Sequence, residues 1–408
     1  MKKSLAKKIF APFALLLVLA VSACQISTEN SSSNDNSTGA GTSSPHSSSC
    51  LKDSEQNNES SGNSESSGNS ESSESSGNSE SSESSELPSQ SSAEQEIVTD
   101  ALSIHFPFVG NKSSGDCTLI KVGNTEVLID AGSTKGSAAT IVPYIQEFCT
   151  DGILEYVIAT HAHEDHIAAF VGSSTSKGIF ESFVCETIID FPKTKATSQI
   201  YNNYVTYRNN EVASGATHYT ALECWNNENG AQKSYTLGEN VTMNILYQKY
   251  YEESTSNENN NSVCVMVSQE DKHFLFTGDL EHSGEKSLIE SNNLPKCALY
   301  KAGHHGSNTA SSSELLSVIQ PERVVACCCC GDTYKFPHQE FLDNIAPYTD
   351  KLYIQAIVSG STYKLLNGNI VLSSDGKEVT VNCSNNNTLF KDTDWFKQNR
   401  TLPQAWQS

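Results

Sequence analysis

The chain has 408 residues, of which 37% are hydrophobic and 18% are charged, and its formal net charge at pH 7 is −22. Proteins that grip nucleic acid through many phosphate contacts usually present a basic face, so this composition gives no support to tight non-specific DNA binding. Residues 25–92 hold eleven acids and one lysine, and four lysines precede residue 9, which leaves the remaining body with a net charge of −16.

The first 24 residues have the pattern of an export signal. Four lysines precede an apolar run from Ile9 to Val21, which is too short to be a membrane span of the mature protein. The run ends in Val21-Ser22-Ala23-Cys24, which is similar to the lipobox of bacterial lipoproteins, where the cysteine is acylated. We therefore predict a lipoprotein signal peptide over residues 1–24, with Cys24 lipidated and the protein anchored to the outer face of the cytoplasmic membrane. An ordinary secretory signal is the alternative.

Residues 25–95 consist almost entirely of Ser, Glu, Asn and Gly, with an irregular repeat from Glu59 to Glu86. Such a segment has too little apolar surface to offset the entropy of ordering, and its acidic charge repels itself. The composition predicts a disordered tether that holds the body, residues 96–408, away from the cell envelope.

The body alternates strand and helix patterns, which is typical of α/β layering. In chain order we expect strands at Ile104–Phe108, Cys117–Val122 and Thr125–Asp130, a helix at Ala138–Phe148, and strands at Leu154–Ile158 and Phe183–Phe191. Gly123 and Asn124 predict a hairpin turn between the second and third of these strands. A helix or lid segment is expected from Gln199 to Arg208.

The strand ending at Ile158 leads into Thr160-His161-Ala162-His163-Glu164-Asp165-His166. Three imidazoles and two carboxylates within six residues are not a core feature, because unpaired polar groups are costly to bury. On an extended backbone His161 and His163 point to the same side, and the turn of the loop brings Asp165 and His166 near. Imidazole and carboxylate are ligands of zinc, manganese and iron, so the segment predicts a metal site.

Three further strand ends carry polar residues of the same kind. Asp130 ends a strand and is expected to orient a ligating histidine, although an acid there could also cap a turn. A hairpin with strands at Val263–Val267 and His273–Thr277 ends in Gly278-Asp279, and Asp279 is the natural carboxylate to bridge two metals, with a helix N-cap as the alternative role. The strand at Leu299 leads into His304 and His305, of which one is expected to bind metal and the other to support it or contact substrate.

The run Cys327–Cys330 lacks the spacing of a zinc knuckle. Four adjacent cysteines at the end of an apolar strand are more readily explained as small buried side chains than as ligands. The thirteen cysteines of the chain leave disulfide pairing open.

These segments together resemble the metallo-β-lactamase fold superfamily. The resemblance lies in Leu128-Ile129-Asp130-Ala131-Gly132, the histidine motif from Thr160 to His166, Thr277-Gly278-Asp279, and Gly303-His304-His305-Gly306-Ser307. Within the superfamily the chain is similar to the hydrolase domain of the ComEC competence family, through Gly115-Asp116, Asn259–Val263, Asp332-Thr333-Tyr334, Pro337-His338 and Gly368–Gly376. The resemblance implies a four-layer αββα sandwich.

The resemblance also implies two divalent metal ions, zinc or manganese. His161 and His163 would hold the first, Asp165, His166 and His305 the second, and Asp279 would bridge them. Asp130 and His304 would support the ligands. The superfamily usually has a further histidine before the Gly-Asp hairpin, where this chain has asparagines, so an Asn carbonyl or a water would complete the first site. His338 and Tyr334 become candidates for holding a substrate oxyanion, and Asp165 for orienting the attacking water.

The expected activity is hydrolysis by metal-activated water, most readily of a phosphodiester in nucleic acid or in a cell-wall polymer. A phosphorylcholine esterase acting on teichoic acid and a lactamase or lactonase are the alternative enzymes. A surface binding lipoprotein on a degenerate fold is the non-enzymatic alternative. No protein partner is inferred.

Overall fold

The computed structural model describes residues 101–407, which all belong to one compact unit. The predicted signal peptide with Cys24 and the predicted tether lie outside the described residues and stay predictions. Within residues 101–407, no helix combines the length and the apolar character needed to cross a membrane.

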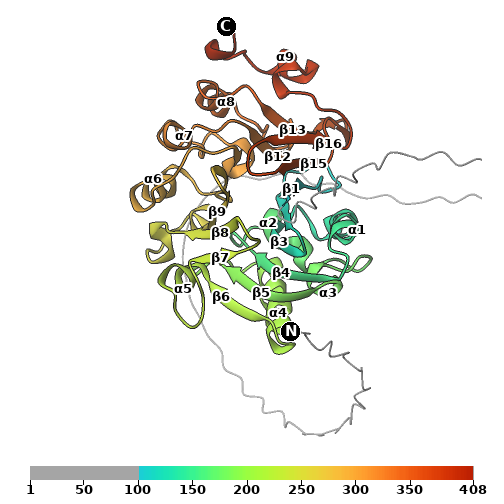
Figure 1. Ribbon diagram of the computed structural model, residues 1–408. Helices are drawn as coiled ribbons and strands as arrows, with labels where there is room; N and C mark the ends of the chain where they lie inside the picture. Colours follow the sequence, from blue (N-terminus) through green and yellow to red (C-terminus); the bar gives the residue numbers. More distant parts are fainter. Residues whose placement is uncertain (1–100, 408) are drawn as a thin grey trace, which may run out of the picture. The chain divides into compact units, whose positions relative to one another are not determined.

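The first sheet has eight strands in the order β16-β15-β1-β2-β3-β4-β5-β6. Figure 1 shows β15 and β16, from the end of the chain, beside β1 from its start. The strands from β3 to β6 run parallel, and the others pair antiparallel. Their bounds are β1 Leu102–Phe106, β2 Cys117–Val122, β3 Thr125–Ala131, β4 Ile153–Ile158, β5 Val184–Asp190, β6 Thr217–Thr220, β15 Ile370–Ser374 and β16 Val379–Cys383.

The second sheet also has eight strands, in the order β14-β13-β12-β11-β10-β9-β8-β7. Its strands from β10 to β13 run parallel, so each sheet joins antiparallel strands to a parallel half. The bounds are β7 Ser234–Thr236, β8 Val241–Leu246, β9 Cys264–Gln269, β10 Lys272–Phe276, β11 Leu299–Lys301, β12 Val324–Cys330, β13 Leu352–Ser359 and β14 Thr362–Leu365.

Helices cover the outer faces of the two sheets (Figure 1). Apolar residues of α1 and α2 belong to the core around the first sheet, and those of α6, α7 and α8 belong to a second core against the other sheet. The four-layer αββα arrangement predicted from the sequence is therefore confirmed. The helix bounds are α1 Ala138–Phe148, α2 Glu164–Val171, α3 Ile179–Ser182, α4 Gln199–Ala213, α5 Ala221–Asn226, α6 His282–Ser291, α7 Ser313–Ile319, α8 Gln339–Ile345 and α9 Asp394–Asn399.

Strand β12 shows how the period of two in a strand divides its side chains between the cores. Val325 and Cys327 join the core around the first sheet, whereas Cys328 and Cys330 join the core that contains residues of α6–α8. Cys327–Cys330 are all buried and all free, so the prediction that they are small apolar core residues is confirmed. Every cysteine among residues 101–407 is free.

The predicted secondary structure is largely confirmed. The helix at Ala138–Phe148 and the strand at Cys117–Val122 have the predicted bounds, and both predicted hairpins form. The first predicted strand is too long at its end, because β1 stops at Phe106, before Pro107. Proline lacks the N–H that a ladder requires, which accounts for the earlier end.

His105 on β1 is a buried histidine outside the strand-end clusters. Its Nδ1 lies 2.9 Å from the Tyr144 hydroxyl and its Nε2 lies 2.9 Å from Ser103 Oγ, while its ring centroid lies 4.3 Å from that of Phe148. Burial, assisted by the charge of Lys121, lowers the pKa of His105 to about 4. In the unfolded chain the same histidine takes up its proton near pH 6.5.

We therefore expect the free energy of unfolding to fall as the pH drops from about 6.5 to 4, since only the unfolded chain binds the proton there. Above pH 6.5 His105 is neutral in both the folded and the unfolded chain, so its full contribution to the free energy of unfolding is present there. Between pH 6.5 and 4 the free energy of unfolding changes by up to about 1.4 kcal/mol per pH unit. Urea unfolding of the wild type and His105→Gln at pH 7, 6 and 5 measures it. The variant should show the shallower pH slope, and equal slopes would contradict the prediction.

Candidate metal centre

The candidate site lies where strand ends of both sheets meet. Asp130 stands near the end of β3, and His161 follows β4 by three residues. On the second sheet, Asp279 follows β10 by three residues, and His305 follows β11 by four. Ligand sites of α/β proteins lie at the carboxyl ends of parallel strands, so the topology brings these residues together although they are far apart in sequence.

The Asp279 carboxylate lies at the centre of the site. Its Oδ2 lies 3.2 Å from His166 Nε2, 3.5 Å from His305 Nε2, 3.7 Å from His304 Nε2 and 4.0 Å from His161 Nε2. Asp279 itself is buried, and its backbone N–H donates to Ser262 Oγ at 3.0 Å. One carboxylate within 4.0 Å of four imidazoles is the arrangement expected of a residue that bridges two cations.

Asp165, His166, Asp279 and His305 form a compact group of four potential ligands. Each offers one ligand atom, and these atoms all lie within 4.8 Å of one another. His305 Nε2 lies 3.3 Å from Asp165 Oδ2. Gly132 makes this geometry possible, because a Cβ at that position would lie 1.8 Å from the backbone oxygen of Asp165. Any larger residue there would push the start of α2 away from the site.

His161 and His163 form a second pair of neighbouring imidazoles. His161 Nε2 is 3.0 Å from His163 Nδ1, and the two ring centroids are 4.7 Å apart. His161 is fully buried, and burial together with the neighbouring His166 charge lowers its pKa well below the usual value. A neutral imidazole has a free lone pair, which is the form that binds metal.

Asp130 positions His166. Asp130 Oδ2 lies 2.7 Å from His166 Nδ1, so this nitrogen donates and Nε2 is turned toward Asp279. The other oxygen of Asp130 accepts from the Thr160 N–H at 2.7 Å, which fixes the carboxylate. Burial alone would lower the pKa of His166, but the Asp279 and Asp130 carboxylates raise it well above the usual value.

Asp116 and Lys301 form a buried ion pair behind His305 that sequence reasoning did not place in the site. Asp116 Oδ1 lies 3.1 Å from His305 Nδ1, which also lies 3.0 Å from the Cys327 carbonyl oxygen. Burial would raise the pKa of Asp116, but the Lys301 ammonium and His305 lower it to about 2. The sequence did hold one signal for this pair, because Lys301 ends an apolar strand, Leu299–Lys301. A lysine in such a position is buried and needs a partner of opposite charge.

The donor set fits divalent metal ions. Among residues 101–407, the buried atoms without a hydrogen-bond partner include His166 Nε2, His305 Nε2 and Asp279 Oδ1. Leaving three buried polar atoms unpaired at one point costs several kcal/mol in total, at about 1–3 kcal/mol each. Cations of the zinc or manganese type accept imidazole nitrogen and carboxylate oxygen, so they would satisfy all three atoms.

The asparagine segment before the Gly-Asp hairpin, where the resemblance leads us to expect a further histidine, is a short 3₁₀ helix, Glu258–Asn261. The Asn260 Oδ1 accepts from the Glu281 N–H, and Asn261 Nδ2 donates to Glu258. Ser262 contacts His161, with its Oγ 3.4 Å from Nδ1. That nitrogen is on the far side of the ring from the Nε2 that faces Asp279, so the contact orients His161 and adds no ligand.

His304 and His338 contact different parts of the site. His304 Nε2 faces Asp279 at 3.7 Å, while its Nδ1 lies 3.0 Å from Thr309 Oγ1. The two ring nitrogens of His338 are both engaged, Nδ1 by the Asn308 N–H and Nε2 by the Tyr334 carbonyl oxygen. His338 therefore braces the Tyr334 loop and has no N–H left for an oxyanion, contrary to the sequence expectation.

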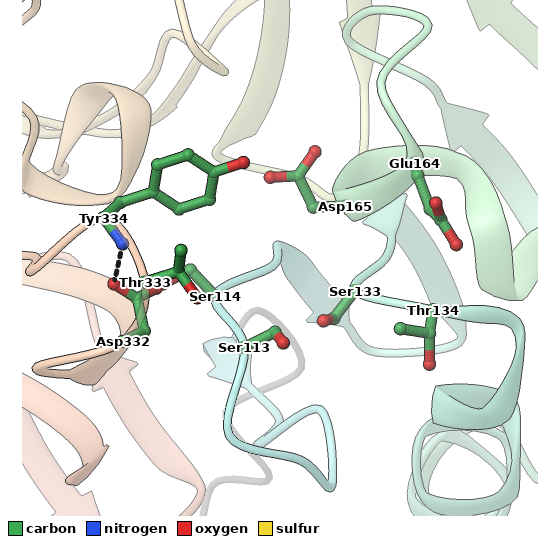
Figure 2. A pocket seen from close by; sticks show the side chains of 9 residues that line it. All are labelled: Ser113, Ser114, Ser133, Thr134, Glu164, Asp165, Asp332, Thr333 and Tyr334. Carbon is green, nitrogen blue, oxygen red and sulfur yellow. Dashed lines mark hydrogen bonds between the residues drawn. The ribbon is translucent and has the colours of Figure 1, made fainter. Parts of the chain in front are cut away.

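Tyr334 lines a cavity that opens beside Asp165 (Figure 2). Its ring is 67% exposed, and Figure 2 shows its hydroxyl pointing toward the Asp165 carboxylate. The cavity was not predicted, because its walls come from three loops and the first turn of α2, which no local pattern connects. It is lined by Ser113, Ser114, Ser133, Thr134, Glu164, Asp165, Asp332, Thr333 and Tyr334.

Comparisons with known proteins show which sequences and structures the chain is similar to. Residues 110–179 match the model of a family described as the metallo-beta-lactamase superfamily. Over 239 residues the chain is 28% identical to recombination protein 2 of Haemophilus influenzae, covering 57% of this chain and 25% of that protein. Over 248 residues it is 24% identical to competence protein ComA of Neisseria gonorrhoeae, covering 60% and 30%. The chain thus spans between a quarter and a third of these relatives.

Among solved structures, the metallo-beta-lactamase fold protein YhfI from Bacillus subtilis is 12% identical, with a TM-score of 0.39, and the match covers 67% of this chain and all of that one. The family model and the curated relatives confirm the resemblance to the metallo-β-lactamase superfamily and to competence proteins that the sequence motifs predicted.

Proposed function

Starting from the match to the metallo-β-lactamase superfamily and from curated relatives that include a recombination protein and a competence protein, we propose that this chain is a metal-dependent phosphodiesterase. The observation that carries the proposal is the position of Asp279, whose Oδ2 lies within 4.0 Å of four imidazoles. A buried carboxylate surrounded by imidazole nitrogens that lack hydrogen-bond partners is costly for the fold. Apolar side chains in the same place would stabilise the fold better, so the polar cluster indicates a function.

In the proposed assignment, His161 and His163 would hold one cation, and Asp165, His166 and His305 would hold a second. Asp279 would contribute its carboxylate to both. Divalent zinc or manganese held there supplies Lewis acidity and a water nucleophile near neutral pH. Imidazole and carboxylate ligands suit both metals.

The protein's own groups then position the reactants. Asp165 lies at the mouth of the cavity, where its carboxylate can accept a proton from the attacking water. The water oxygen bonds to phosphorus, the P–O bond to the departing alcohol breaks, and a proton ends on that alcohol. The Tyr334 hydroxyl can donate a hydrogen bond to a phosphoryl oxygen, and His304, with 22% of its side chain exposed, can contact the departing group.

The test is cleavage of bis-p-nitrophenyl phosphate by the full chain. We expect EDTA to abolish p-nitrophenolate release, and zinc or manganese to restore it. Nitrocefin, a chromogenic lactam, serves as the parallel substrate and should remain intact. If the metal-loaded protein leaves the phosphodiester intact, the phosphodiesterase proposal is wrong.

We also propose that the chain acts at the bacterial cell surface, held there by lipid on Cys24. Support comes from the sequence alone, in the lipobox-like Val21-Ser22-Ala23-Cys24. Replacing Cys24 by serine should move the protein from the membrane fraction to the soluble exported fraction. Unchanged fractionation of the variant would contradict lipid anchoring.

A further inference from the structure

We propose that the cavity beside the candidate metal centre binds a neutral, hydroxyl-rich alcohol group of the phosphodiester, that is, a polyol or a sugar. This inference rests on the proposed function and extends it by naming the chemistry of the substrate. It is carried by the position of the cavity, the chemistry of its lining and the way its exposed aromatic ring is held.

The position of the cavity makes it a substrate site. Asp165 belongs both to the compact ligand group and to the cavity wall, so a group bound in the cavity lies next to the reacting phosphorus. The cavity volume is about 280 Å³. Pockets for drug-sized ligands run from roughly 300 to 1,000 Å³, so this one suits a single sugar-sized unit.

The lining favours hydroxyl groups over anions. It consists of hydroxyl-bearing residues and three carboxylates, and none of its nine residues is lysine or arginine. Carboxylates accept strong hydrogen bonds from hydroxyls, and serine and threonine can both donate and accept. A further phosphate in the cavity would meet like charge. A neighbouring cavity that shares Glu164 is lined by Lys195. The absence of a basic side chain is therefore a feature of the cavity beside Asp165 and not of its neighbour.

The walls are already fixed by hydrogen bonds. Asp332 Oδ2 accepts from Ser114 Oγ at 2.6 Å, which ties the loop before β2 to the loop after β12. Asp332 Oδ1 accepts from the Tyr334 N–H at 3.0 Å, a bond drawn in Figure 2. Little conformational freedom is then left to lose when an alcohol binds.

Tyr334 supplies one flat apolar wall. Its ring stacks on Phe336 with centroids 5.5 Å apart, and Phe336 packs in turn against His305 at 5.7 Å. An exposed aromatic ring held in this way can cover the C–H face of a sugar or polyol. A single ring does not form the aromatic cage that recognises quaternary ammonium, so choline is the less favoured occupant.

The experiment compares four p-nitrophenyl phosphodiesters with the full, metal-loaded chain. Their second alcohols are glycerol, choline, thymidine (through its 5′ oxygen) and a second p-nitrophenol. We expect kcat/KM for the glycerol ester to exceed that for each of the others about tenfold. Preference for the choline ester or for the thymidine ester, or equal values for all four, would overturn the inference while leaving the proposed function standing.

The variant that probes the cavity is Tyr334→Ala. Because the side chain is exposed, its removal should leave the fold intact, and the preference for the glycerol ester over bis-p-nitrophenyl phosphate should fall toward one. Tyr250→Ala is the matched control, because Tyr250 lines none of the cavities described and contacts Ser283 instead. A preference that survives in Tyr334→Ala would contradict the assignment.

A direct binding measurement separates the two proposals if none of the four esters is cleaved. Saturation-transfer NMR with glycerol 1-phosphate and thymidine 5′-monophosphate reports occupancy without turnover. Stronger transfer to the glycerol protons, lost in Tyr334→Ala, would support the cavity assignment although the phosphodiesterase proposal had failed. No transfer to glycerol 1-phosphate would overturn the cavity assignment itself.

Discussion

Replacing Asp279 by asparagine is expected to slow cleavage of bis-p-nitrophenyl phosphate by about a thousandfold or more. A factor of a thousand corresponds to about 4 kcal/mol of activation free energy. The physical reason is the position of Asp279 Oδ2, 3.2 Å from His166 Nε2 and 3.5 Å from His305 Nε2. Asparagine keeps the shape but loses the negative charge that a bridging ligand supplies. The measurement is kcat/KM with zinc or manganese at saturation.

Asp271→Asn is the matched control for this experiment. Asp271 lies in the turn of the same hairpin, and 80% of its side chain is exposed. Its replacement should leave both the rate and the stability unchanged, within about 0.5 kcal/mol for the latter. If Asp279→Asn retains wild-type activity, Asp279 does not serve the reaction, and the assignment of the bridging ligand fails.

Replacing Lys301 by methionine is expected to lower the free energy of unfolding by about 3–5 kcal/mol. The variant leaves the carboxylate of Asp116 buried without its cation, and both side chains are almost fully shielded from water. This loss reflects the cost of leaving a buried charge unpaired. It does not measure the net stabilisation that the ion pair provides. Urea unfolding of the metal-free protein measures it without interference from ligand binding.

The double variant Asp116→Asn with Lys301→Met separates these two contributions. Because it removes both charges, it should recover most of the stability lost in the single variant. Lys286→Met is the surface control, since Lys286 is 77% exposed and pairs with Glu290 at 4.0 Å, and it should cost less than about 1 kcal/mol. A small loss in Lys301→Met would contradict the buried ion pair.

Residues at the ends of periodic strands could be placed from the sequence. The apolar runs before His161, Asp279 and His305 identified strands, and a polar residue just after a buried strand has few explanations other than a site. The structure places these residues around one point, where strand ends of the two sheets meet. The four-layer architecture followed from the same strands and from the resemblance they carried.

Contacts that depend on tertiary packing could not be placed in this way. The Asp116–Lys301 pair joins two sheets across 185 positions of sequence, and each residue alone has no periodic signal. The orientation of His338 depends on Asn308, which lies in another loop. The cavity beside Asp165 requires Ser114 to meet Asp332, a contact that only the packed fold creates.

The central claim is that strand ends from two sheets hold divalent metal ions, and the metal content of the protein tests it most directly. The full chain would be incubated with zinc or manganese and then separated from excess metal by gel filtration. Its metal content would be measured by elemental analysis and compared with that of the double variant His166→Ala, Asp279→Asn. The account predicts about two ions per wild-type chain and a clear loss in the double variant. Equal metal content in the two proteins, or none in either, would contradict it.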